Sequence, residues 1–287
     1  MEERVQWTAG GMRYAGIVHQ PEGLKPGERR AAFLVLHGFG SNKDSETMKT
    51  VARLFASLGY VALRFDMRGC GESEGERGRV ICLEQVEDTK AAAGFLTNHP
   101  NVKSVAVFGH SFGAAVAVYA AGVDPRIAAC VSSGGWGDGA KKFRKQHESA
   151  QAWQRFSAML EEGRRRAQRG ERMMVPRFDI VPIRPELRGN LAPGSHLEFP
   201  FEVVESMYAF TANEVVGKIA PRPLLLLHPA HDTVTPTEQS IDLFLHAGQP
   251  TDLHLFAQTD HFLFSDRNAI VHSVLRDWLA RYLPARE

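Results

Sequence analysis

The stretch that most constrains the fold is residues 104–122, where an apolar run leads through a glycine-flanked serine into a helix of small residues. Residues 104–108 have the length and composition of a buried strand, and the alanine-rich residues 112–122 predict a helix. Between them lies the sequence Gly109-His110-Ser111-Phe112-Gly113. A turn this tight tolerates only glycine at its flanks, because a Cβ atom there would collide with the neighbouring strand or helix. The pattern predicts a serine hydroxyl that stands clear of a sheet, at a helix N-terminus.

Apolar runs of strand length alternate with helical patterns on both sides of this stretch. The expected strands cover residues 32–36, 60–65, 104–108, 127–132, 224–227 and 253–256, and the expected helices cover residues 47–58, 83–96, 112–122, 237–247 and 269–282. Continuous apolar runs are typical of strands that helices cover on both faces. We therefore expect an α/β fold with a mostly parallel, doubly wound sheet. Residues 5–7 and 12–19 flank a Gly-Gly turn and predict an antiparallel pair at the start of the chain.

The alternation of strands and helices is interrupted once. It stops after Ser133 and resumes near residue 223, and the segment between is too long for a plain connection. We expect residues 134–216 to form an inserted cap over the carboxyl edge of the sheet. Residues 1–133 and 217–287 would then form the core.

The inserted segment is locally basic. Residues 141–188 contain 13 Lys or Arg and 6 Asp or Glu, although the formal net charge of the chain is +1. A solvated surface explains this excess most simply, and attraction of an acidic substrate or partner surface is the alternative. Trp153, Phe156 and Leu160 have helical spacing, whereas residues 173–191 are rich in proline and arginine and predict irregular structure.

Composition excludes several broad classes of protein. No basic run is interleaved with aromatic residues, as a groove for nucleic acid would need. The three cysteines are widely spaced, so they predict neither a disulfide framework nor a zinc site and suit a reducing compartment. The first residues are charged, and the most apolar window, residues 105–123, contains His110, Ser111 and three glycines. We expect a cytoplasmic protein with no signal peptide, no membrane segment and no nucleic-acid partner.

A serine hydroxyl becomes a good nucleophile only with a base within hydrogen-bond reach, and that base needs a carboxylate to orient it. Asp232 follows the apolar run 224–227, and His261 follows the run 253–256. Both residues are therefore expected beyond the carboxyl ends of strands, where an open α/β sheet places its ligand site. We predict Ser111 as nucleophile, His261 as base and Asp232 as orienting carboxylate.

Acyl transfer also needs two donors for the oxyanion that develops. We expect the backbone N–H of Phe112, directly after the serine, and the N–H of Phe39 in the turn His37-Gly38-Phe39-Gly40. Asp260 is a rival orienting acid, which we disfavour because adjacent side chains diverge and it directly precedes His261. His228-x-x-His231 lacks a third ligand at a suitable spacing, so we expect no metal and no cofactor.

Together these motifs resemble those of the α/β-hydrolase superfamily, over nearly the whole chain apart from the insertion. The matching motifs are His37-Gly38-Phe39-Gly40, Asp66-x-Arg68-Gly69-x-Gly71-x-Ser73, Gly109-His110-Ser111-Phe112-Gly113, Asp232-x-x-x-Pro236 and Asp260-His261. The layout is similar to that of compact bacterial carboxylesterases of the cinnamoyl and feruloyl type, which carry an insertion after the strand that follows the helix next to the nucleophilic serine. Serine peptidases of the prolyl-oligopeptidase and proline-aminopeptidase kinds share the same motifs.

The resemblance implies a serine hydrolase that cleaves a small-molecule carboxylic ester through an acyl-enzyme on Ser111. Amide or peptide hydrolysis is the nearest alternative, and a binding protein on an inactive hydrolase scaffold is another. Aromatic and apolar residues of the insertion are candidates for the substrate pocket, or equally for a buried core of the insertion itself. These candidates are Trp136, Trp153 and Tyr208, with Phe156, Met207 and Phe210 beside them. The sequence specifies neither the acyl length nor the alcohol of the substrate. A homodimer is one possible assembly.

Overall fold

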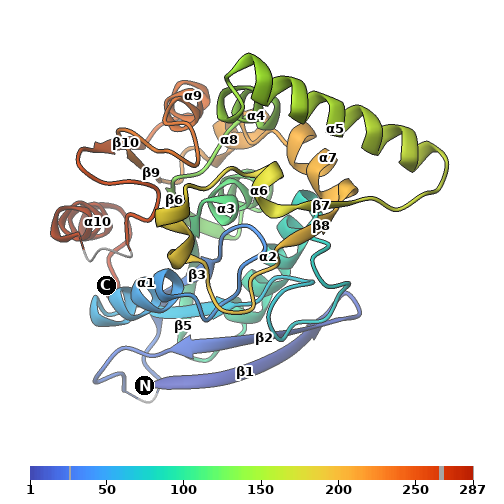
Figure 1. Ribbon diagram of the computed structural model, residues 1–287. Helices are drawn as coiled ribbons and strands as arrows, with labels where there is room; N and C mark the ends of the chain where they lie inside the picture. The colour runs from blue at the N-terminus through green and yellow to red at the C-terminus, as the bar shows by residue number, and fades with distance from the viewer. Residues whose placement is uncertain (26, 265–267, 287) are drawn as a thin grey trace.

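The computed structural model describes residues 1–25, 27–264 and 268–286, which form one eight-stranded sheet between two layers of helices, with a further layer at one end (Figure 1). The strand order is β1-β2-β4-β3-β5-β6-β9-β10. Only β1 and β2 run antiparallel to their neighbours, so the expected mostly parallel, doubly wound sheet is confirmed. The bounds of the strands are β1 (Glu2–Ala9), β2 (Met12–His19), β3 (Arg30–Leu36), β4 (Val61–Phe65), β5 (Val102–His110), β6 (Ile127–Ser133), β9 (Leu224–Pro229) and β10 (Thr251–Phe256).

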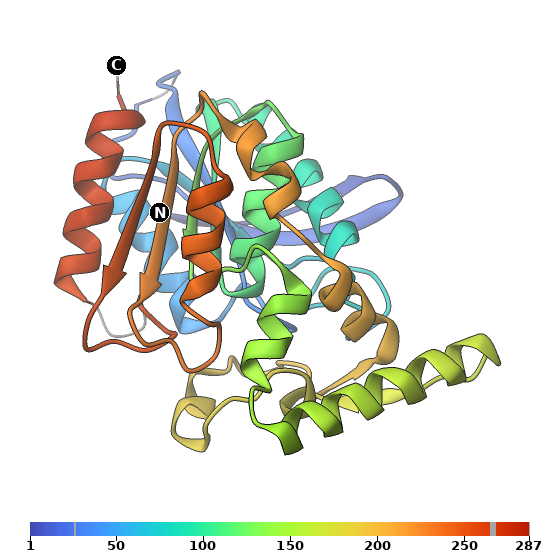
Figure 2. The same ribbon diagram turned by 90° about the horizontal axis from the view of Figure 1, so that it is seen from above.

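Helices cover both faces of this sheet (Figure 2). One face carries α1 (Glu46–Ser57) and α10 (Ala269–Tyr282), and the other carries α2 (Cys82–Thr97), α3 (Phe112–Val123) and α9 (Glu238–His246), with the short α8 (Asn213–Val216) against α3 and α9. The strand β3 shows why helices are needed on both faces of the sheet, because its successive side chains point to opposite faces. Phe33 packs in the cluster with α1 and α10, and Leu34 packs in the cluster with α2 and α3.

The insertion lies beyond the carboxyl ends of the strands, since the arrowheads of β9 and β10 point toward it in Figure 2. Its elements are α4 (Gly139–Gln146), α5 (Ala150–Gln168), β7 (Met174–Pro176), α6 (Arg177–Ile180), the 3-10 helix η1 (Pro185–Asn190), β8 (Glu198–Pro200) and α7 (Phe201–Ala209). The last residues of the segment 134–216 form α8, which packs back onto the core against α3 and α9. A second 3-10 helix, η2 (Gly217–Ile219), follows α8. The helix expected around Trp153 is α5.

The expectation of irregular structure over residues 173–191 is wrong in part. This segment contains β7, α6 and η1, and β7 pairs antiparallel with β8. Three-residue strands are too short to show a periodic pattern in sequence, and their pairing depends on a partner more than 20 residues away. Within the described ranges, no helix has the length and apolar character needed to cross a membrane.

Candidate active site

Ser111 lies at the turn between β5 and α3, in a backbone conformation that few side chains adopt. Its φ is +56°, in the left-handed region. A Cβ atom on Gly109 would overlap the carbonyl oxygen of Gly113, and one on Gly113 would lie 2.5 Å from the carbonyl oxygen of His37. The steric argument made from the sequence therefore describes the turn correctly: both glycines are required because backbone passes directly beside them.

The hydroxyl of Ser111 is not used to cap the helix that follows it. Ser111 is the N-cap residue of α3, a position where serine ordinarily bonds to an N–H of the first turn, but here there is no such side-chain bond. Its own N–H donates to the carbonyl of Ser133 at the end of β6, over 2.8 Å. The turn thus fixes the backbone of Ser111 and leaves its hydroxyl for other partners.

His261 and Asp232 form a buried pair. Nδ1 of His261 lies 2.8 Å from Oδ2 of Asp232, whose side chain is fully buried. The other carboxylate oxygen accepts hydrogen bonds from the N–H groups of Val234 and Thr235, at 2.7 and 2.8 Å. Burial alone would raise the pKa of Asp232, but the neighbouring imidazoles of His261 and His228 outweigh it and hold that pKa well below its usual range. The carboxylate is therefore ionised at neutral pH.

A second histidine also contacts the Asp232 carboxylate. Nε2 of His228 lies 3.0 Å from the carbonyl oxygen of Thr235 and 3.3 Å from Oδ2 of Asp232, and its Nδ1 lies 2.6 Å from the hydroxyl of Ser240. A carbonyl oxygen only accepts, so the geometry assigns the proton to Nε2. The sequence placed His228 near the acid without a defined role, and the structure makes it a donor to this carboxylate. His231 is exposed.

The rival acid, Asp260, does not face the imidazole of His261. Its Oδ1 accepts from the N–H groups of Thr233 and His261, at 2.9 and 2.8 Å, and its Oδ2 accepts from the hydroxyl of Thr233 at 2.8 Å. Asp260 therefore ties the loop that carries His261 to the loop that carries Asp232. This is a positioning contact rather than an alternative to Asp232.

Ser111 and His261 line the same small cavity, of about 40 Å³. Gly38 and Phe39 line it too, so the three loops that follow β3, β5 and β10 meet there. His110 lies against His261, with ring centroids 5.0 Å apart. Burial, followed by the charge of the neighbouring His261, lowers the pKa of His110 to about 3, so His110 is neutral at ordinary pH. The structure thus brings together the side chains that the motifs predicted to meet.

The two expected oxyanion donors lie close to the serine. A Cβ atom on Gly38 would be 3.7 Å from the Cβ of Ser111, so the loop after β3 passes beside it. The rings of Phe39 and Phe112 have centroids 5.8 Å apart. Phe112 is the first residue of α3, and an N–H at that position has no partner within its own helix.

The aromatic residues proposed for the substrate pocket are not brought to this cavity. Trp136 is 1% exposed and packs against Phe112 and Phe210. Trp153 and Tyr208 line a shallow groove on the outside of the insertion. Phe156, Met207 and Phe210 are buried.

The residues of the insertion that do line the cavity come from the segment 177–191, for which the sequence predicts no role in the site. The residues concerned are Arg177, Val181, Ile183, Asn190 and Leu191. These residues form no periodic pattern, so their sequence contains no clear signal that they line the cavity.

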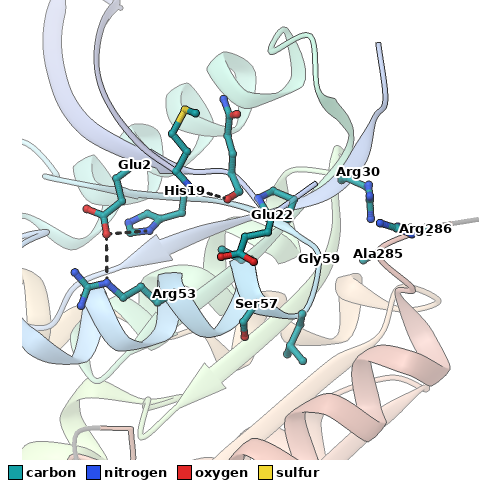
Figure 3. A pocket seen from close by; sticks show the side chains of 14 residues that line it. Glu2, His19, Glu22, Arg30, Arg53, Ser57, Gly59, Ala285 and Arg286 are labelled. Carbon is teal, nitrogen blue, oxygen red and sulfur yellow. Dashed lines mark hydrogen bonds and ion pairs between the residues drawn. The ribbon is translucent and has the colours of Figure 1, made fainter. Parts of the chain in front are cut away.

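A larger hollow, of about 570 Å³, lies at the opposite end of the sheet (Figure 3). It is lined by the end of β2, the start of β3 and residues 285–286, and Glu2 pairs with two of its basic side chains. Glu2 lies 3.7 Å from His19 and 3.2 Å from Arg53, as the dashed lines in Figure 3 mark. Burial and the nearby Arg64 lower the pKa of His19 to about 4. His19 in this hollow is therefore neutral at ordinary pH.

Across the part of the chain that the structure describes, no group of three or more His, Cys, Asp or Glu side chains is arranged to hold a metal ion. The three cysteines are free and buried. The reactive groups that the structure brings together at the smaller cavity are Ser111 and His261, with Asp232 hydrogen-bonded to His261.

The chain is similar in sequence to known enzymes. A family model described as serine aminopeptidase, S33, matches residues 27–177, more than half of the chain. The polyketide transferase grgF of Penicillium sp. is 26% identical over 276 residues, which cover 91% of each chain. The thiohydrolase aneE of Aspergillus aculeatus is 25% identical over 276 residues, which cover 88% of this chain and 84% of the relative.

Solved structures show the same fold. The α/β hydrolase GrgF from Penicillium sp. sh18 has a TM-score of 0.77 at 22% identity and is matched over 99% of each chain. Est1E from Butyrivibrio proteoclasticus, solved with ferulic acid bound, has a TM-score of 0.71 at 17% identity over 97% of this chain and 99% of that one. The resemblance that the motifs indicated is confirmed: the chain belongs to the S33 serine aminopeptidase family of α/β-hydrolases.

Proposed function

We propose that this protein is a serine hydrolase that cleaves the carboxylic ester of a small molecule through an acyl-enzyme on Ser111. The observation that carries the proposal is the shared cavity of Ser111 and His261, with His261 held by a buried, ionised Asp232 at 2.8 Å. A nucleophile, its base and an orienting carboxylate are the minimum that acyl transfer at a serine needs.

In the first half of the reaction, Nε2 of His261 takes the proton of Ser111 as its oxygen attacks the acyl carbon. The carbonyl π electrons move onto the oxygen, and the N–H groups of Phe39 and Phe112 bind this oxyanion. Asp232 accepts from Nδ1 of His261 and stabilises the imidazolium. When the tetrahedral intermediate collapses, the bond to the alcohol breaks, and the imidazolium returns the proton to the departing oxygen.

In the second half, water takes the place of the alcohol. His261 removes a proton from that water as it attacks the acyl carbon, and the oxyanion forms again between the same two N–H groups. Collapse breaks the bond to Ser111, which recovers its proton from His261. The carboxylic acid leaves, and the enzyme returns to its starting state.

Acyl transfer from a thioester is a second candidate. It is favoured by the relatives, among which one is named a polyketide transferase and another a thiohydrolase. Both candidates use the same acyl-enzyme and differ in the leaving group and in what accepts the acyl chain. The assembly of residues around Ser111 serves either of them.

We also propose that residues 134–216 act as a cap on this site. The cavity at Ser111 holds about 40 Å³, which is room for a few water molecules and too little for an aromatic or long acyl chain. Arg177, Val181 and Leu191 of the insertion form part of its wall. Binding of such a chain would therefore need these side chains to move outward.

A fluorophosphonate probe tests the proposal directly. The wild-type protein is expected to be labelled at one site, and Ser111→Ala is expected to abolish labelling. Ser57→Ala is the matched control and should be labelled like the wild type, because Ser57 lies in the larger hollow and its hydroxyl bonds to the carbonyl of Leu54. An unlabelled but folded wild-type protein would favour a binding protein on an inactive scaffold.

Three substrates then separate the reaction classes. A short-chain nitrophenyl ester, an acyl thioester and an aminoacyl anilide are compared by kcat/KM in the wild type and in Ser111→Ala. Turnover of the ester above that of the anilide supports esterase activity. A preference for the thioester, with acyl transfer to an added alcohol, would replace hydrolysis with transfer, and a preference for the anilide would replace it with aminopeptidase activity.

A further inference from the structure

Arg177 is a buried arginine that the insertion contributes to the wall of the Ser111 cavity. It is the first residue of α6, and it is 3% exposed. One terminal nitrogen donates to the carbonyl oxygen of Phe39 over 2.6 Å, and the other donates to the carbonyl oxygen of His196 over 2.9 Å. Its guanidinium therefore joins the loop after β3 to the segment that leads into β8.

Aromatic packing reinforces the same connection. The rings of Phe39 and Phe199 stack with centroids 4.1 Å apart, and the guanidinium lies 5.2 Å from the first ring and 5.9 Å from the second. Gly40 has a φ of +49°, and a Cβ atom there would overlap the ring of Phe199. The loop that carries Phe39 is thus enclosed by side chains of the insertion.

The charge of Arg177 is not paired with a carboxylate in the part of the chain that the structure describes. Within the described ranges, no carboxylate forms an ion pair with it, and its Nε makes no hydrogen bond. Burial lowers the pKa of Arg177 to about 10, so it remains a cation at neutral pH. A buried cation without a carboxylate is costly and requires strong acceptors, which here are two backbone carbonyls.

We propose that Arg177 is a positioning residue that holds Phe39 with its backbone N–H toward the oxyanion, so that the oxyanion hole is complete only when the insertion is in place. The inference rests on the proposed acyl-enzyme at Ser111. Fixing both the carbonyl oxygen and the ring of Phe39 leaves that residue little freedom to rotate. Its N–H direction is then set by contacts from Arg177 and Phe199.

The size of the expected effect follows from what an oxyanion donor contributes. Removal of one donor typically lowers kcat by about 100- to 1000-fold. Loss of Arg177 loosens the donor without removing it, so we expect kcat to fall by about 10- to 100-fold. KM should change little, because the interaction strengthens in the transition state rather than in the ground state.

The competing explanation is that Arg177 binds an acidic group of the substrate. That role would show in KM, and only for substrates that carry such a group. A neutral nitrophenyl ester and an ester whose acyl chain ends in a carboxylate therefore distinguish the two roles. A trifluoromethyl ketone adds a third readout, since it binds serine hydrolases as an anionic adduct that occupies the oxyanion hole.

The experiment compares Arg177→Lys and Arg177→Ala with Arg164→Met, a matched change of an insertion arginine that pairs with Glu205 on the surface. We expect both Arg177 variants to lose kcat on both esters, with KM within about threefold of the wild type. The ketone should bind more weakly by a similar factor, and added guanidinium should restore part of the activity of Arg177→Ala. Arg164→Met should behave like the wild type.

Unchanged kcat in Arg177→Ala would overturn the inference, as would a rise in KM confined to the acidic ester. If the Arg177 variants lose their fold by circular dichroism, Phe199→Leu decides, because it removes the stacked ring and keeps Arg177. That variant should also lose kcat and ketone affinity, and wild-type values of both would refute the inference. Failure of the proposed function looks different, because wild-type protein would then show no Ser111-dependent labelling or turnover.

Discussion

The core loops and the insertion face the same cavity, but they are held in place by different means. In the core, Ser111 has a left-handed backbone between two glycines, and Asp232 is fully buried with four hydrogen-bonding groups around its carboxylate. On the outer side of the insertion, Arg164 pairs with Glu205 and Arg166 with Glu162, between side chains that are about one-third to one-half exposed. Such pairs contribute little to stability.

The difference shows where sequence changes are tolerated. Close backbone packing leaves no room for a Cβ atom at Gly109 and Gly113, and full burial beside two histidines restricts the residue types that suit the position of Asp232. The insertion shares a buried apolar cluster with the core and is also joined to it by polar contacts such as Arg177 to Phe39, whereas its outer face carries exposed ion pairs. The following experiments measure this contrast.

The largest effect is expected from Asp232→Asn. An amide in place of the carboxylate no longer stabilises the imidazolium and favours the wrong tautomer of His261, so kcat on the nitrophenyl ester should fall about 10,000-fold. Asp260→Asn is the control from the adjacent loop contact and should cost far less, because Asp260 binds backbone N–H groups and the hydroxyl of Thr233. A larger loss in Asp260→Asn than in Asp232→Asn would reverse the assignment of the acid.

A pair of glycine substitutions compares the two regions at the level of stability. Gly113→Ala should cost more than about 3 kcal/mol or prevent folding, because the new Cβ would lie 2.5 Å from a carbonyl oxygen of the neighbouring backbone. Gly189→Ala, in the insertion, should change stability by less than about 0.5 kcal/mol, because nothing lies within 4 Å of its Cβ position. Urea unfolding of both variants measures the difference, and equal costs would contradict it.

The core was predictable because its signals are long and repeated. The expected ranges 12–19 and 269–282 coincide with β2 and α10, and the glycine pattern around Ser111 follows from contacts within one strand–turn–helix unit. Asp232 and His261 could be placed together without coordinates, since parallel strands end at one edge of the sheet. The same reasoning placed Phe39 beside the serine.

The insertion was predicted poorly for physical reasons. The short elements β7, β8 and α6 are set by tertiary pairing rather than by a local pattern. Trp153 is a candidate for the pocket because it is aromatic, yet it faces an outer groove, whereas no pattern in the sequence distinguishes Arg177 from the other arginines of the insertion. An arginine can be buried where backbone carbonyls accept its hydrogen bonds. Those carbonyls come from distant segments of the chain, so no residue spacing in the sequence predicts which arginine is buried.

A second buried cation of the insertion provides a stability test. Lys142 in α4 is 1% exposed, with Nζ 4.7 Å from the ring centroid of Trp136 and 4.0 Å from that of Phe143, and it has no hydrogen-bond partner among the described residues. Burial lowers its pKa to about 7 from an ordinary 10.5. Replacement of this buried ionisable group by an apolar side chain of similar volume removes the free-energy cost of burying it, so Lys142→Met should gain about 1–4 kcal/mol.

The gain from Lys142→Met should depend on pH. Between pH 7 and 10.5 the unfolded wild-type chain binds the proton of Lys142 and the folded chain does not, so wild-type stability rises with pH across this range. The advantage of the variant is then largest near pH 7 and shrinks toward pH 10. Melting curves of both proteins at several pH values test this, and an advantage that grows with pH would contradict a buried, neutral lysine.

The smallest effect is expected from the arginines on the outer face of α5. Their basic charge has two explanations, a solvated surface or attraction of an acidic substrate. If Arg164, Arg165 and Arg166 only solvate α5, their joint replacement by glutamine changes stability by less than about 1 kcal/mol and leaves kcat/KM within twofold for both neutral and acidic esters. If they attract acidic substrates, the wild type loses kcat/KM with rising salt for the acidic ester alone, and the triple variant starts from the lower value. Each of these arginines already pairs with Glu162 or Glu205, which cancels much of the local field, so we expect the first result.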